Sequence, residues 1–150
     1  MRVQFRQVYQ APQQMVWAYL HDPDILSRAL PGCKKLQRAG KGHFLVEMGL
    51  DVGPVKGTFT GTVDLLELNE PKQYRLIQKG KGKPGELLAD AMVYLTPVSK
   101  GTEVRCDAQV EVTGMMASLG QRIMGGVAKL LLSRFFKNVE SEMHNAATRP

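Results

Sequence analysis

Residues 116–144, MASLGQRIMGGVAKLLLSRFFKNVESEMH, decide the fold, because their apolar side chains recur with the period of one long helix. Placed at about 100° per residue, one apolar set shares a face, which we expect to lie against a sheet. This set is Leu119, Ile123, Val127, Leu130 and Leu131. A second set points well away from the first: Leu132, Phe135, Phe136 and Val139. Such a wide apolar arc must be covered on two sides, either by a packed sheet core or by an apolar cavity for which the helix is the lid.

The chain before this helix predicts the sheet. Hydrophobicity alternates with period two through residues 33–113, and Gly and Pro turns separate the alternating segments. This pattern indicates about six antiparallel strands with one face in solvent. The inward positions of the second long segment are Val55, Phe59 and Val63, whereas Lys56 and Thr58 point to solvent.

The first thirty residues predict one strand, over residues 3–9, and two short helices. Pro12 suits the first turn of one helix, and Asp22 followed by Pro23 suits the N-cap and first position of the other. Pro31-Gly32 ends the second helix. The element order therefore predicts an α+β fold in which a curved antiparallel sheet wraps the long C-terminal helix.

Small residues are frequent on the inward face of the predicted sheet: Gly57, Gly61, Gly80, Gly82, Ala89, Ala91, Cys106 and Ala108. They either permit bulges and coiling of the strands or leave a genuine apolar cavity. Gly125 and Gly126 lie in the middle of the long helix, where each costs about 1 kcal/mol relative to Ala. They either kink the helix or let another surface, such as these small residues, approach closely.

The composition is that of an ordinary globular chain, with 43% hydrophobic and 23% charged residues among 150, which suits a single domain over residues 1–150. The net charge of +6 favours an anionic partner, namely a membrane surface, an acidic protein or nucleic acid. Nucleic acid is disfavoured, because only 7% of residues are aromatic and none are interleaved with the basic ones. Without a signal peptide or a run of about 18 apolar residues, we expect a cytoplasmic protein.

The sequence carries no pattern of a catalytic or metal site. His21, His43 and His144 are scattered, with no metalloprotease, nucleophile-elbow or phosphate-loop motif. We therefore predict no catalytic and no metal-binding residues. Cys33 and Cys106 lack CxxC spacing, which favours two free thiols, although a single disulfide also fits.

A basic stripe, defined by Arg75, Lys79, Lys81 and Lys83, follows the solvent side of one predicted strand. Two explanations fit it. Lysines on an exposed strand prevent aggregation, or the stripe docks on acidic lipid or on an acidic enzyme surface.

Five stretches carry a family resemblance: residues 31–36 (PGCKKL), 52–61 (VGPVKGTFTG), 80–82 (GKG) and 119–122 (LGQR), and Phe135-Phe136. The resemblance is to the CoxG family of carbon monoxide dehydrogenase, within the START-like, birch-pollen-allergen (Bet v 1-like) superfamily of helix-grip folds. It implies a helix-grip fold, a hydrophobic ligand, no catalysis, and association with a carbon monoxide dehydrogenase-type molybdenum hydroxylase and its recruitment to the membrane. Peripheral contact with the inner face of the membrane is therefore expected.

We expect the ligand to be a respiratory quinone or a lipid, bound without any covalent cofactor. The expected cavity lining is Phe44, Val46, Met48, Phe59, Gly61, Val63, Leu76, Gln78, Ala91, Val93, Cys106, Ala108, Val110, Leu119, Ile123, Val127, Leu130 and Arg134. Gln78 and Arg134 are the polar members and the candidates to bond a ligand carbonyl. The alternative is an enzyme that uses the same cavity, since the superfamily includes polyketide cyclases and dehydratases.

Overall fold

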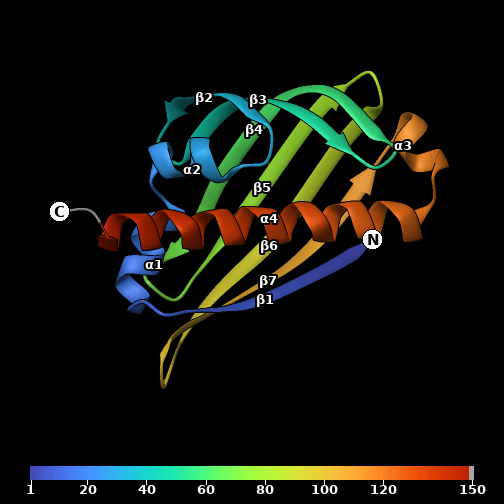
Figure 1. The fold of residues 1–150 in the computed structure, drawn as a ribbon. Coiled ribbons are helices and arrows are strands. Elements are labelled where there is room, and N and C mark those ends of the chain that lie inside the picture. Colours follow the sequence, from blue (N-terminus) through green and yellow to red (C-terminus); the bar gives the residue numbers. More distant parts are fainter. Residues whose placement is uncertain (149–150) are drawn as a thin grey trace.

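The computed structural model describes residues 1–148 and is built on one seven-stranded antiparallel sheet, in the order β1-β7-β6-β5-β4-β3-β2 (Figure 1). Along the chain the elements are β1 (Arg2–Tyr9), α1 (Gln13–Leu20), α2 (Pro23–Ala29), β2 (Cys33–Gly40), β3 (His43–Val52), β4 (Val55–Asn69), β5 (Gln73–Gly82), β6 (Gly85–Val98), β7 (Gly101–Val112), α3 (Gly114–Ser118) and α4 (Gln121–Thr148). The sheet curves around α4, which confirms the predicted α+β helix-grip fold.

The predicted strand register is confirmed. Val55, Phe59 and Val63 are buried, whereas Lys56 and Thr58 are exposed. The six strands of the meander pair with their sequence neighbours, and β1 closes the other side by pairing with β7. One face of the sheet is therefore apolar and concave, and the other is exposed to solvent.

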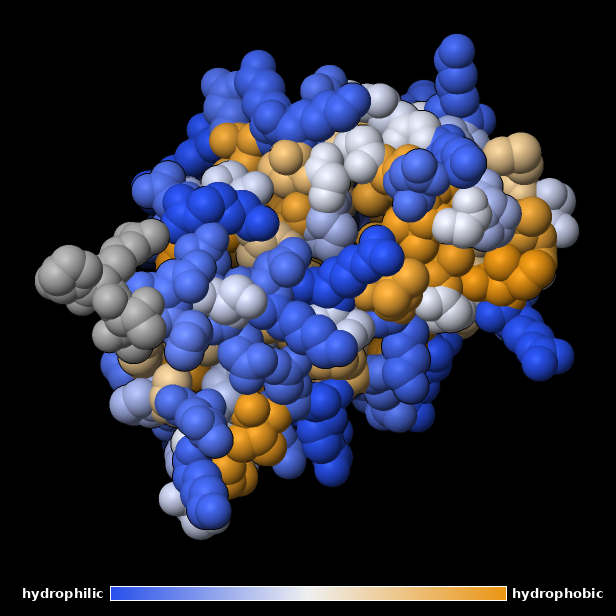
Figure 2. All heavy atoms as spheres, in the orientation of Figure 1, coloured by the Kyte–Doolittle hydropathy of each residue, from blue (hydrophilic) through white to orange (hydrophobic). Residues whose placement is uncertain are grey.

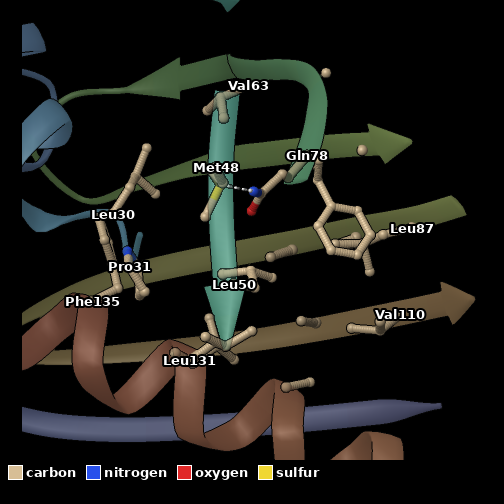
Figure 3. Close-up of a pocket in the computed structure, with 18 of the residues that line it drawn as sticks. Leu30, Pro31, Met48, Leu50, Val63, Gln78, Leu87, Val110, Leu131 and Phe135 are labelled. Carbon is tan, nitrogen blue, oxygen red and sulfur yellow. Dashed lines mark hydrogen bonds between the residues drawn. The ribbon is translucent and has the colours of Figure 1, made fainter. Parts of the chain in front are cut away.

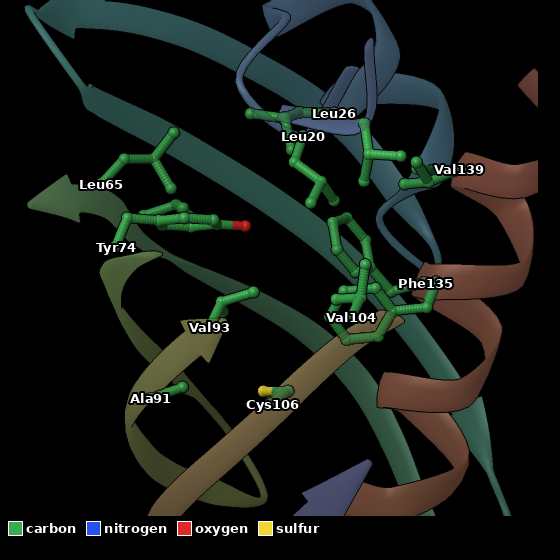
Figure 4. Close-up of a cluster of buried hydrophobic side chains, with 14 of the residues drawn as sticks. Leu20, Leu26, Leu65, Tyr74, Ala91, Val93, Val104, Cys106, Phe135 and Val139 are labelled. Carbon is green, nitrogen blue, oxygen red and sulfur yellow. The ribbon is translucent and has the colours of Figure 1, made fainter. Parts of the chain in front are cut away.

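The two short helices follow their predicted signals. The Asp22 carboxylate accepts hydrogen bonds from the backbone N–H groups of Asp24 (2.9 Å) and Ile25 (3.3 Å), as an N-cap does. Pro12 stands directly before α1. Val16, Trp17 and Leu20 of α1 and Ile25, Leu26 and Ala29 of α2 join the main hydrophobic cluster (Figure 4).

The C-terminal segment is two helices and not the single helix predicted. Leu119 and Gly120 separate α3 from α4, and Gly120 has φ +89°, a left-handed conformation that favours glycine. Gly125 and Gly126 do not kink α4, which runs unbroken through them. Neither faces the small residues of the sheet, because Gly126 borders open space and Gly125 lies beside Met1.

The predicted inward face of this helix is wrong in part. Val127 is buried and Leu119 packs half-buried on a small cluster with Met116, but Ile123 and Leu130 are 47% and 41% exposed. The buried face of α4 is instead Met124, Val127, Phe135, Phe136, Val139 and Met143. The second apolar set decides the phase, because its two phenylalanines have the largest area to bury. Placed at about 100° per residue, Ala128 and Leu132 lie on the same side as the two phenylalanines, whereas Ile123 and Leu130 lie on the opposite side.

The C-terminal half of α4 is fixed on both of its edges. On one edge, the Tyr9 hydroxyl of β1 donates to the Phe136 carbonyl at 2.5 Å, and the Phe5 ring stacks on Phe136 with centroids 5.1 Å apart. On the other edge, the Asn138 amide donates to the Ala29 carbonyl of α2 at 3.0 Å. These contacts set α4 diagonally across the concave face (Figure 1).

An aromatic cluster beneath α1 contains a half-buried histidine. His21 stacks on Trp17 with ring centroids 4.1 Å apart and meets the edge of Tyr74 at 4.4 Å. Its Nδ1 donates to the Trp17 carbonyl at 2.8 Å, while its buried Nε2 has no hydrogen-bond partner among residues 1–148. Burial lowers the pKa of His21 below its ordinary value, although the bond to Trp17 acts in the opposite sense.

We predict that His21 makes the folded state less stable in acid. Because its pKa is lower in the folded than in the unfolded chain, the unfolded chain takes up the proton first as the pH falls below about 6.5. The free energy of unfolding, measured with urea, should therefore fall between about pH 7.5 and pH 5.5. His21→Phe should reduce that slope, whereas His144→Asn, at an exposed position on α4, should keep it. An equal slope in both variants would contradict the assignment.

Candidate apolar ligand cavity

An apolar cavity of about 140 Å³ lies between α4 and the concave face of the sheet (Figure 3). Strands β3 to β7 form its floor, and α3 and α4 cover it. Leu30 and Pro31, which follow α2, and Leu50 of β3 stand opposite Leu131 of α4. All four are half-buried, so the cavity reaches the surface between α4 and the α2–β3 side of the sheet.

Two features of the chain create this space. The backbone of α4 approaches β1 and α2 most closely, so it stands further from the central strands. Those strands present small side chains to it, since Gly80 lines the cavity and Ala91 is paired with Ala108. A longer side chain at these positions would fill the gap, and none is present.

Two of the glycines serve the curvature of the sheet rather than the space beneath it. A Cβ on Gly61 would collide with the Lys79 carbonyl oxygen, and one on Gly82 with the Thr58 carbonyl oxygen. Gly80 differs, because its Cβ would meet only Phe59, at an ordinary 3.8 Å. Both explanations offered for the small residues therefore hold, at different positions.

Most of the residues predicted to line a cavity surround this one: Val46, Met48, Phe59, Gly61, Val63, Leu76, Gln78, Ala91, Val93, Cys106, Ala108, Val110 and Val127. They alternate along their strands, which is why the period-two pattern could identify them. That they contact a ligand stays a prediction.

Five of the predicted lining residues lie elsewhere. Phe44 belongs to the packed core, and Leu119 packs half-buried beside the cavity. Ile123, Leu130 and Arg134 are exposed on the outer side of α4, because the phase of the helix differs from the one predicted. The lining residues that the sequence prediction missed include Leu26, Leu30, Pro31, Leu50, Met116, Met124, Leu131, Leu132 and Phe135. Leu132 and Phe135 were in the second apolar set and needed only the correct phase, whereas Leu131 was already on the predicted inward face but was not among the predicted lining residues.

Gln78 brings a carboxamide to an otherwise apolar wall (Figure 3). Its Nε2 donates weakly to the Met48 sulfur at 3.3 Å, and no described residue bonds its oxygen. A half-buried amide with an unmet bond is free to pair with a polar group of a ligand. The Cys106 thiol also lies on the wall, and burial raises its pKa to about 12. This thiol therefore stays protonated and unreactive near neutral pH.

The three histidines lie away from the cavity. His43 pairs with Asp64 on the outer face of the sheet, His144 is exposed on α4, and His21 is enclosed by aromatic rings. Within residues 1–148 no three His, Cys, Asp or Glu side chains are grouped to hold a metal ion. Cys33 and Cys106 are free thiols, as expected.

Two of the four residues of the basic stripe are paired with acids. Arg75 forms a bidentate pair with Asp90, at 2.8 and 2.6 Å, and a 3.2 Å bond to Glu67. Lys81 lies 3.7 Å from Glu86. Hydrogen bonding to Arg75 lowers the pKa of Asp90, which keeps that carboxylate charged. The outer face of β5 and β6 is therefore a mixed-charge surface.

The model of the CoxG family, which is described as the G subunit of carbon monoxide dehydrogenase, matches residues 7–144. The chain belongs to the CoxG family. This confirms the resemblance drawn from the motifs, and it agrees with an accessory role rather than a catalytic one. A comparison with curated proteins finds no match.

Solved structures agree with the CoxG fold. A conserved protein from Geobacillus kaustophilus is 32% identical over 97% of both chains, with a TM-score of 0.93. A protein from Thermus thermophilus is 15% identical over 99% of this chain and 100% of its own, with a TM-score of 0.75. One from Nitrosomonas europaea is 16% identical over 99% and 97%, with a TM-score of 0.70. The last two likenesses show the fold alone. None of the helices in residues 1–148 has the length and apolar character needed to cross a bilayer.

We predict that filling the cavity stabilises the protein in the absence of ligand. Ala89 lines the cavity and is half-buried, so Ala89→Val should place two methyl groups in empty apolar space and raise the free energy of unfolding by about 1 kcal/mol. Ala29→Val is the control, because Ala29 is fully buried in α2 away from the cavity and overpacking there should destabilise by about 1–3 kcal/mol. Urea denaturation measures both, and destabilisation by both variants would mean that the cavity is closed in solution.

Proposed function

We propose that this CoxG-family chain carries a hydrophobic small molecule without transforming it, and that a respiratory quinone is the best candidate. The observation that supports the proposal is an apolar cavity with a single carboxamide on its wall. A quinone combines an apolar ring and tail with carbonyl oxygens, and Gln78 offers the matching hydrogen bond. A phospholipid or fatty acid is the other candidate ligand.

The size of the cavity indicates how such a ligand would lie. About 140 Å³ is close to the volume of an apolar cavity that holds one benzene ring. The ring of a quinone would therefore fit under α4 near Gln78, and its tail would leave through the opening beside Leu30, Leu50 and Leu131. Each CH₂ that these side chains cover contributes about 0.8 kcal/mol.

The family name supplies the proposed partner. An enzyme of the carbon monoxide dehydrogenase type produces electrons, and its membrane acceptor would be an apolar quinone that must cross water to reach it. We propose that this chain shields the quinone between the bilayer and such a molybdenum hydroxylase. An enzyme of the cyclase type would need an acid or base inside the cavity, and the described lining has no His, Asp or Glu.

The carrier proposal predicts a bound ligand and a specific role for Gln78. Native mass spectrometry and solvent extraction of freshly purified protein should detect a quinone or lipid. Decylubiquinone should bind to the emptied protein, and Gln78→Leu should weaken it about fivefold, because a net hydrogen bond is worth about 1 kcal/mol. Palmitate should bind both proteins equally if the amide recognises the quinone ring.

Gln109→Leu is the matched control, since Gln109 is exposed on β7 and should leave binding unchanged. If neither decylubiquinone nor palmitate binds and no lipid is extracted, the carrier proposal fails. Chemical conversion of an added polyketide-like compound would favour the cyclase alternative.

A further inference from the structure

Large apolar side chains protrude from the two C-terminal helices into solvent. Met115 on α3 is 54% exposed, and on α4 Ile123 and Leu130 are 47% and 41% exposed. Together with the half-buried Leu119 these form the α3–α4 rim. Figure 2 shows apolar surface over α3 and the start of α4, at the right of the view.

The rim adjoins the opening of the cavity. Ile123 and Leu130 are seven residues apart and lie on the same edge of α4 as Val127, which lines the cavity. The opposite edge is occupied, since Phe136 packs on Phe5 and Gly125 lies beside Met1. The rim edge therefore continues the cavity wall outward from Val127 and Leu131.

The charged residues of α4 beside the rim have one sign. From Gln121 to Val139 the only charged residues of α4 are Arg122, Lys129, Arg134 and Lys137, and all four are exposed. None of them forms an ion pair with a residue in the described chain, in contrast to Arg75 of the basic stripe. Exposed apolar side chains flanked only by basic ones are typical of a helix lying at an anionic membrane surface.

From this charge complementarity we propose that the α3–α4 face docks on an anionic lipid bilayer. The rim side chains enter the boundary between headgroups and acyl chains, and the four basic side chains contact phosphate groups. This orientation turns the cavity opening towards the bilayer, so a ligand would pass between the two without crossing bulk water. The last step rests on the proposed carrier function, whereas the docking itself does not.

The test compares this face with the outer face of the sheet by sedimentation of the intact protein with phosphatidylcholine vesicles, with and without phosphatidylglycerol. Ile123→Ser with Leu130→Ser should weaken binding to the anionic vesicles by about tenfold or more. Leu45→Ser with Leu88→Ser is the matched control, because these leucines of β3 and β6 are 45% and 37% exposed. The control should bind as the wild type does.

Charge is tested in the same way. Lys129→Gln with Lys137→Gln should weaken binding about tenfold, whereas Lys79→Gln with Lys83→Gln on the basic stripe should have little effect. High salt should release the wild type from the vesicles. The proposal is overturned if the wild type ignores anionic vesicles, or if the variants of β3, β5 and β6 lose as much binding as those of α4.

The two proposals fail separately. Rim variants that keep decylubiquinone binding in detergent but transfer it slowly between vesicles would support both. Vesicle binding through α4 with no ligand bound by any variant would support the docking proposal and reject the carrier proposal. Ligand binding in the wild type without any vesicle binding would support the carrier proposal and reject the docking proposal.

Discussion

The structure depends on how α4 is attached at its C-terminal half. Tyr9 and Phe5 of β1 hold Phe136 on one edge, and Arg28 and Ala29 of α2 hold Glu142 and Asn138 on the other. A rigid helix fixed along half its length cannot settle independently onto the sheet with the other half. The contacts of the C-terminal half with β1 and α2 therefore also set the distance between the first three turns of α4 and the central strands. Only longer side chains could fill that distance.

The central strands do not supply those side chains, and the sheet cannot collapse instead. Its backbone is held by ladder hydrogen bonds from β1 to β2, and its curvature is set at positions such as Gly61 and Gly82 where a Cβ has no room. An empty apolar space of about 140 Å³ costs on the order of 3 kcal/mol in lost contacts, judged from cavities made by substitution. A ligand that restored those contacts would recover this free energy, which is the physical basis of the proposed binding of apolar molecules.

The sequence predicted the fold correctly where the hydrophobic periodicity of a segment matches the face that the fold buries. The strands have one buried face, so alternation gave both the strand and the side of Val55, Phe59 and Val63. The Asp22-Pro23 signal located α2 because capping is local. On the C-terminal helix the local pattern was degenerate, since two apolar sets compete for one buried face. Contacts with β1 and α2 bury the second set rather than the first. These contacts join segments far apart in the chain, so the hydrophobic pattern of the helix alone cannot predict them.

The site was partly readable for the same reason. Its floor comes from alternating strand positions, but its opening is made by Leu30, Pro31 and Leu131, which separate segments bring together. The missed break at Leu119-Gly120 matters here, because it lets α3 turn Met116 inward and leaves Met115 outside. The size of the cavity depends on the height of α4 and on sheet curvature, neither of which is a property of any short stretch.

The outer face of the sheet and the exposed side of α4 differ in how their charges are paired. On the outer face of the sheet, Arg75 is matched by Asp90 and Glu67, and Lys81 by Glu86, as expected of a surface that faces water. On α4, Arg134 and Lys137 are three residues apart with no acid between them, a spacing at which like charges repel by a few tenths of a kcal/mol. A glutamate four residues before Lys129 or Lys137 would stabilise the helix, yet Gly125 and Ser133 occupy those positions. Local rules are broken in this way where a surface serves something other than its own stability. On α4 the unpaired basic residues lie near the exposed Ile123 and Leu130 and near the opening of the cavity.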